Sequence, residues 1–151
     1  MSPMLTRILL GFVAAVIAVL TFHQGTIWVL ASMGLAQASV YSLVPVPPLG
    51  VPRIVNLCFW GGLYGAVYGA VWPRLTIPSW LSGLGLGILA SLVGMFVVAS
   101  IKGAPVANGW AAWPMARSLI INGVWGLGVG LIMPLLLARA MPAAPIRVGR
   151  P

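Results

Sequence analysis

Few side chains in this 151-residue sequence could take part in chemistry. It contains one histidine, His23, one cysteine, Cys58, and no aspartate or glutamate. Without carboxylates, paired-acid hydrolysis, calcium or magnesium cages and carboxylate proton relays are excluded. One histidine and one cysteine also cannot supply a nucleophile, a base and an orienting group. We therefore expect a protein that is not an enzyme, with no catalytic residue and no metal site.

His23 and Gln24 form the most polar pair deep inside an apolar stretch. Polar groups at membrane depth are costly when they lack a hydrogen-bond partner. On its own helix Thr26 is a candidate partner for His23; on neighbouring helices Asn56 and Asn122 are candidates for a bond that fixes packing. The functional alternatives are a proton-responsive site, because histidine titrates near neutral pH, or one axial haem ligand. Haem with two histidine ligands would need a partner subunit, so we expect no cofactor.

A row of glycines recurs at every fourth residue in the segment 54–72 and so lies along one face of a helix. Such a row lets another backbone approach closely, which supplies packing in lipid where hydrophobicity cannot. The row is Gly61, Gly65 and Gly69; Gly126 and Gly130 repeat the pattern later, and Gly83, Gly87 and Ser91 do so in between. It predicts tight packing inside one bundle or, alternatively, an interface between copies of the chain around a pore.

An aromatic row with the same period runs beside these glycines and consists of Trp60, Tyr64, Tyr68 and Trp72. Ring faces attract cations and stack on conjugated molecules, so the row could form the wall of a groove for a flat or cationic ligand. The alternative is that these rings serve only packing and anchoring at the membrane surface.

Two arginines, Arg53 and Arg117, stand where we expect the second and fourth helices to begin. The helix dipole is already positive at that end, so a further cation is unfavourable unless an anion lies nearby. Dipole and arginine together would bind phosphate or carboxylate. Lipid phosphate is the expected anion, and a transported anion is the alternative.

The elements that must position these residues are membrane spans. The composition is 61% hydrophobic, and a span needs about 20 mostly apolar residues. We place four such stretches at 5–30, 54–72, 77–100 and 118–138. The sequence therefore predicts an all-α, polytopic membrane domain over residues 1–140, followed by a basic, disordered tail at 141–151.

The eight basic residues predict how the spans are oriented, because lysine and arginine near helix ends stay on the cytoplasmic side. With the N-terminus inside, the outer side has three of them, Arg53, Lys102 and Arg117. The inner side has five: Arg7, Arg74, Arg139, Arg147 and Arg150. We therefore expect both termini in the cytoplasm. Because the charges are scattered among helix ends, anionic lipid head groups, and no nucleic acid, are the expected partner.

The connections suggest two similar helical hairpins. Shifting the second span by 65 residues places Trp60-Gly61 on Trp125-Gly126 and Arg74 on Arg139. The proline-rich stretch 44–52 cannot be helical and should form an extended outer loop. The segment 31–43 either prolongs the first helix or folds back along the membrane interface, and the sequence leaves both open. Residues 102–114 should connect the third and fourth spans at the outer head-group layer.

Three short motifs resemble those of a set of small, uncharacterised four-helix proteins of the bacterial inner membrane. They are Phe22-His23-Gln24, Pro47-Pro48-Leu49-Gly50 and Phe59-Trp60-Gly61-Gly62. The likeness is good over residues 20–75 and looser elsewhere. It implies a bacterial inner-membrane location and four helices, and it implies no role for any residue.

Together these features predict an accessory or assembly subunit of a membrane complex, in contact with unlike membrane subunits. The alternative is a small pore or carrier for a small solute or an anion, built as a glycine-packed homo-oligomer.

Overall fold

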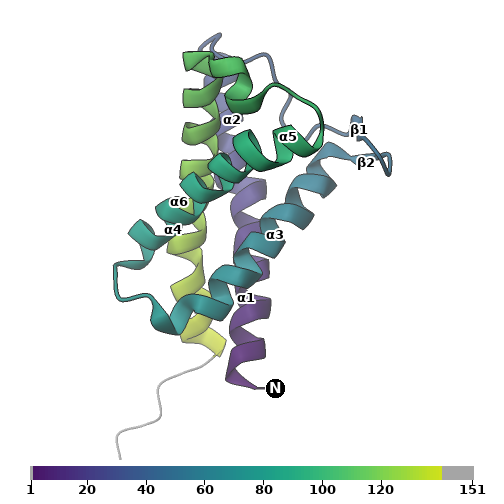
Figure 1. The fold of residues 1–151 in the computed structure, drawn as a ribbon. Coiled ribbons are helices and arrows are strands. Elements are labelled where there is room, and N and C mark those ends of the chain that lie inside the picture. The colour runs from purple at the N-terminus through teal and green to yellow at the C-terminus, as the bar shows by residue number, and fades with distance from the viewer. Residues whose placement is uncertain (1, 141–151) are drawn as a thin grey trace, which may run out of the picture.

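The computed structural model describes residues 2–140, and the predicted basic tail at 141–151 lies outside them. The first helical unit joins α1 (Pro3–Ala18), the π-helix η1 (Val19–His23) and α2 (Gln24–Ser32). The second is α3 (Arg53–Val71) with the short η2 (Trp72–Arg74). The third joins α4 (Ser79–Leu92), the π-helix η3 (Val93–Val98) and α5 (Ala99–Ile101). After η4 (Val106–Trp110), α6 (Ala112–Ala140) forms the fourth (Figure 1).

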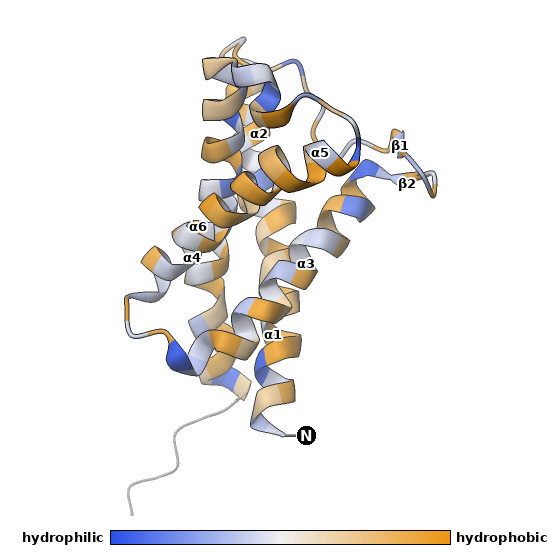
Figure 2. Ribbon diagram, in the orientation of Figure 1, coloured by the Kyte–Doolittle hydropathy of each residue, from blue (hydrophilic) through white to orange (hydrophobic). Residues whose placement is uncertain are grey.

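All four units are long and apolar enough to cross a membrane, which confirms the predicted mostly helical fold with four candidate spans. Hydrophobic residues cover most of the length of the helices, and most of the strongly hydrophilic residues lie toward the helix ends (Figure 2). The start of α1, the connection from α3 to α4 and the end of α6 lie at one end of the bundle (Figure 1). We call this the inner end, and the opposite end the outer end.

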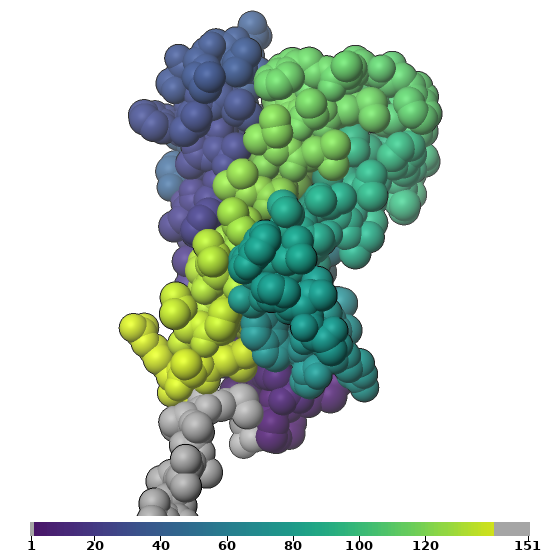
Figure 3. Space-filling model, turned by 90° about the vertical axis from the view of Figure 1, so that its left-hand side faces the viewer, coloured from purple at the N-terminus to yellow at the C-terminus, as the bar shows by residue number. Residues whose placement is uncertain are grey.

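The helices pack in a fixed pattern: α1 lies against α3, α4 lies against α6, and α1 and α6 meet between these pairs. Figure 3 shows α4 crossing α6 on one face of the molecule. Glycines make both close crossings possible. A Cβ on Gly65 would overlap the carbonyl oxygen of Gly11, and a Cβ on Gly126 would overlap the backbone of Gly83. Because no side chain separates the backbones, the helices pack by direct van der Waals contact.

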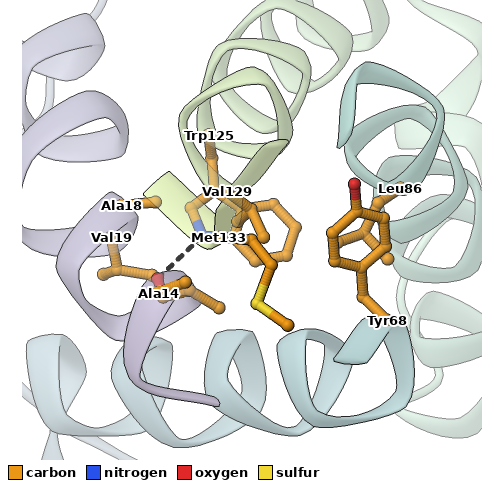
Figure 4. Packing of buried hydrophobic residues seen from close by; sticks show 9 residues of the cluster. Ala14, Ala18, Val19, Tyr68, Leu86, Trp125, Val129 and Met133 are labelled. Atoms are coloured by element: carbon orange, nitrogen blue, oxygen red, sulfur yellow. Dashed lines mark hydrogen bonds between the residues drawn. The ribbon is translucent and has the colours of Figure 1, made fainter. Parts of the chain in front are cut away.

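The centre of the bundle is filled by side chains of α6. Trp125, Val129 and Met133 are each at most 2% exposed and lie between α1 on one side and Tyr68 of α3 on the other (Figure 4). The indole Nε1–H of Trp125 donates to the carbonyl oxygen of Ala15 over 3.1 Å, which ties α6 to α1.

The first helix ends at Ser32 and does not continue through the segment 31–43. Gly34, at a φ of +73°, reverses the chain, and the amide of Leu35 donates to the carbonyl oxygen of Leu30 over 2.8 Å. This is a glycine-terminated helix end in which a left-handed residue closes the last turn. The chain then folds back along its own helix.

Of the two outer connections, the first has the predicted form and the second is shorter than predicted. The proline-rich loop is extended, as predicted, and includes a two-residue antiparallel ladder of β1 (Pro45–Val46) and β2 (Val51–Pro52). The fourth helix begins at Ala112, six residues before the predicted start at 118. Pro114 therefore lies inside its first turn, where backbone amides have no helical acceptor and proline loses nothing.

Candidate functional site

A large cavity lies between α3 and the third helical unit. These two neighbours in sequence barely touch, because each packs on a different partner, α3 on α1 and α4 on α6. The space between them is a groove of about 670 Å³, which is within the range of about 300–1,000 Å³ typical of ligand pockets. Val19, His23 and Trp125 lie along it, with residues of α3 and of the third helical unit on its two sides.

Two π-helices border the groove. Val19 and His23 come from η1, and Val93, Gly94 and Val98 come from η3. A π-turn widens the helix and frees backbone groups, and such turns are common at functional sites. In η1 the amide of Gln24 donates to the carbonyl oxygens of Thr21 and Val19 and not to that of Leu20, which stays available to another donor. The hydroxyl of Tyr41 donates to it over 2.7 Å.

A short hydrogen-bond chain orients His23. The amide of Tyr41 donates to Gln24 Oε1 over 2.7 Å, which fixes the orientation of the Gln24 side chain. Gln24 Nε2 then faces His23 Nδ1 at 3.3 Å, and because an amide NH₂ can only donate, Nδ1 accepts. The ring proton is therefore on Nε2, for which residues 2–140 supply no hydrogen-bond partner. His23 is 9% exposed, on the wall of the groove, and offers it an N–H donor.

Three of the four polar residues predicted from the sequence line this groove. His23, Asn56 and Asn122 all line it, from three different helical units. Gln24 is not on its wall and holds the returning loop instead. The candidate bonds between His23 and Thr26, Asn56 or Asn122 do not form within the described chain, where the side chain of His23 bonds to Gln24. Thr26 donates instead to the carbonyl oxygen of Phe22.

The amides of Asn56 and Asn122 face the groove in different ways. Asn122 Nδ2 donates to the carbonyl oxygen of Ser118 over 3.0 Å, so its Oδ1 remains an acceptor. The Asn56 side chain has no hydrogen bond to any other described residue and keeps both its donor and acceptor capacity. Beside them the hydroxyls of Ser91 and Ser118 bond to each other at 2.7 Å across α4 and α6.

Sequence reasoning missed three polar residues of the groove: Lys102, Ser91 and Ser118. Lys102 follows the end of α5, at the outer end of the groove, and entered the sequence analysis only as a topology signal. Ser91 entered it only as a member of the small-residue row, and neither Lys102 nor Ser118 has a spacing that marks a site. These residues become part of the groove because α4 packs on α6 and because the third helical unit diverges from α3.

The aromatic row divides into two pairs. Trp60 and Tyr64 line the groove, and Tyr64 meets the ring of Trp125 edge to face at 6.4 Å between centroids. Tyr68 and Trp72 do not line it. Tyr68 is buried, and its hydroxyl lies 2.7 Å from that of Ser82. The row thus forms a groove wall over its outer half and packs within the bundle over its inner half.

The glycine row faces inward. Gly65 and Gly69 lie against the backbone of α1, and a Cβ on Gly61 would come within 2.9 Å of Val19 Cγ2. Gly126 and Gly130 lie against the backbone of α4 and its first residue, Ser79. These five positions are therefore used inside one chain.

The two arginines predicted at helix starts occupy different positions in their helices. Arg53 is the first residue of α3 and is exposed. Arg117 is the sixth residue of α6, because that helix begins at Ala112, so its expected place beside free helix amides is wrong. Neither side chain lines the groove.

No protein-family model, no curated protein and no solved structure matches this chain.

Proposed function

We propose that this protein binds an amphipathic molecule of the bilayer in the groove between α3 and α4, and holds or carries it there. The observation that supports this most is the make-up of the groove, whose mainly apolar walls also present His23, Asn56 and Asn122. Polar groups within the hydrocarbon layer need partners. A molecule with both an apolar chain and polar groups meets both requirements at once.

A lateral site favours a carrier over a pore. Trp125, Val129 and Met133 fill the centre of the bundle, so a path along its axis is closed in one chain. The groove opens instead between two spans, and a ligand would enter it sideways from the lipid. Of the two versions of the predicted transport role, the carrier therefore has the better support.

The accessory role predicted from the sequence is the second candidate. It is favoured by the same opening, because α3 and α4 leave a long gap that a helix of an unlike subunit could fill. In that case Trp60 and Tyr64 would contact the partner helix.

We also propose a membrane location and an orientation for the protein. We place it in a bacterial inner membrane with both termini in the cytoplasm, as the basic residues and the family resemblance indicate. The pairs α1–α3 and α4–α6, each joined through a glycine crossing, support two similar hairpins that arose by duplication.

A groove-filling substitution tests the proposal. A Cβ on Gly94 has no atom within 4 Å, so Gly94→Phe should fill the groove without a backbone clash. Gly85 is equally open, lies on the exposed face of α4 and does not line the groove, so Gly85→Phe is the matched control. Each protein is purified in mild detergent, and the lipids and proteins that accompany it are identified by mass spectrometry.

We expect an amphipathic molecule to co-purify with the unchanged protein and with Gly85→Phe, and to be lost from Gly94→Phe. Loss of an unlike protein instead would favour the accessory role. Equal retention of the same molecules by both variants would show that the groove is not a binding site.

A further inference from the structure

We infer that the ligand of the groove is an anionic phospholipid, with its head group at the Lys102 end and its chains along the apolar walls. This inference rests on the proposed function and adds the chemical class of the ligand. It follows from the charge at the mouth of the groove, from the hydrogen-bonding groups inside it and from its position along the helices.

Charge is the first support. Lys102 lines the groove, and the whole sequence contains no aspartate or glutamate that could neutralise it. A cation next to a low-dielectric cavity attracts an anion more strongly than one in water. An occupant with a negative group near Lys102 is therefore favoured over a neutral or cationic one.

Hydrogen bonding is the second support. The Nε2–H of His23 is a donor, and Lys102 has only donors. Asn56 adds an amide that bonds to no other described residue. Phosphate and ester oxygens only accept, so a phospholipid matches this donor set. The single fixed acceptor, Asn122 Oδ1, would suit a hydroxyl on the head group.

Position is the third support. Lys102 directly follows α5, at the outer end of the third span, where head groups lie. The rest of the third-unit wall, from Ala90 to Ile101, lies within that span at the depth of the acyl chains. The cation therefore lies at the head-group end of the groove, and the mainly apolar part of the wall lies where the acyl chains would be.

The test compares lipid binding by native mass spectrometry of the purified, full-length protein. The probes are phosphatidylglycerol, phosphatidylcholine with the same chains, and soluble glycerol phosphate. The variants are Lys102→Gln, Lys102→Arg, which keeps the charge and reports on folding, and Arg139→Gln at the inner end of α6 as the control.

We expect the unchanged protein, Lys102→Arg and Arg139→Gln to prefer phosphatidylglycerol by about fivefold, the ratio expected for one cation beside an anionic head group. Lys102→Gln should bind both lipids equally. Equal binding of both lipids by the unchanged protein, or an unchanged preference in Lys102→Gln, would overturn this inference and leave the proposed function intact. Binding of neither lipid would overturn this inference, whereas the proposed function is overturned by equal retention of the same molecules in Gly94→Phe and Gly85→Phe. Glycerol phosphate bound as tightly as phosphatidylglycerol would show that the site takes a soluble phosphate rather than a lipid.

Discussion

The adjacent polar residues His23 and Gln24 have different structural roles. Gln24 is 3% exposed and accepts from the returning loop, while its NH₂ group fixes the tautomer of His23. His23 in turn faces the groove. One buried amide therefore links the shape of the outer loop to the donor that a ligand would meet.

Replacing Gln24 with leucine should loosen the loop at 33–44. The partly buried amide of Tyr41 would lose its acceptor, at a cost of about 0.5–1.5 kcal/mol. We expect faster proteolysis of this loop and a lower unfolding temperature in detergent. Thr26→Val, which removes only a bond within the helix, is the control and should behave like the unchanged protein. Identical digestion patterns for Gln24→Leu and Thr26→Val would contradict the role given to Gln24.

His23 itself can be tested by two substitutions. Glutamine retains a donor and an acceptor, so His23→Gln should keep the thermal stability of the unchanged protein. His23→Leu leaves the Gln24 NH₂ group without its acceptor and should lower stability by about 1–3 kcal/mol. Thermal unfolding in detergent measures both. A His23→Gln protein that folds normally yet has the cellular phenotype of a deletion would show that the imidazole is needed for function.

At the scale of elements, the sequence predicted the four spans because long apolar runs identify membrane helices directly. The ends of the helices were harder to predict from the sequence. Gly34 is a sequence signal for the end of the first helix, whereas Pro114, inside the predicted connection 102–114, lies in the first turn of α6. The π-helices have no sequence pattern that we could recognise. In η1 a contact with another segment, the bond from Tyr41 to Leu20, satisfies a carbonyl oxygen of the π-turn.

The glycine crossings give a test at this scale. A side chain on Gly65 would meet the backbone of Gly11 and the methyl group of Ala15, and neither can move away freely. Gly65→Leu should therefore destabilise the bundle by about 1–3 kcal/mol, the usual cost of overpacking. Gly85→Leu, on the open face of α4, should have little effect. Equal unfolding temperatures for the two variants would contradict the tight α1–α3 crossing.

At the scale of the whole molecule, the candidate site was predictable in part. His23, Asn56 and Asn122 were chosen because polar residues inside apolar runs need partners, and all three line one groove. The groove itself was not predictable, since it exists because α3 and α4 pack on different helices. Lys102 became part of the site only through that arrangement.

Orientation in the membrane is the last property of the whole molecule that can be tested. Arg7, Arg74 and Arg139 lie toward the inner end of the bundle, and Arg53, Lys102 and Arg117 toward the outer end, so these six residues are balanced.

The predicted inner majority therefore depends on Arg147 and Arg150. Replacing both with alanine should remove the bias and give a mixture of two orientations. The measurement is a pair of C-terminal reporter fusions, one active only in the cytoplasm and one only in the periplasm. The unchanged protein should activate the cytoplasmic reporter alone, whereas the double variant should activate both. Replacing Pro142 and Pro145 with alanine leaves the charge unchanged and is the control. Strong periplasmic activity from the unchanged protein would reverse the assigned orientation and place Lys102, with the mouth of the groove, at the cytoplasmic surface.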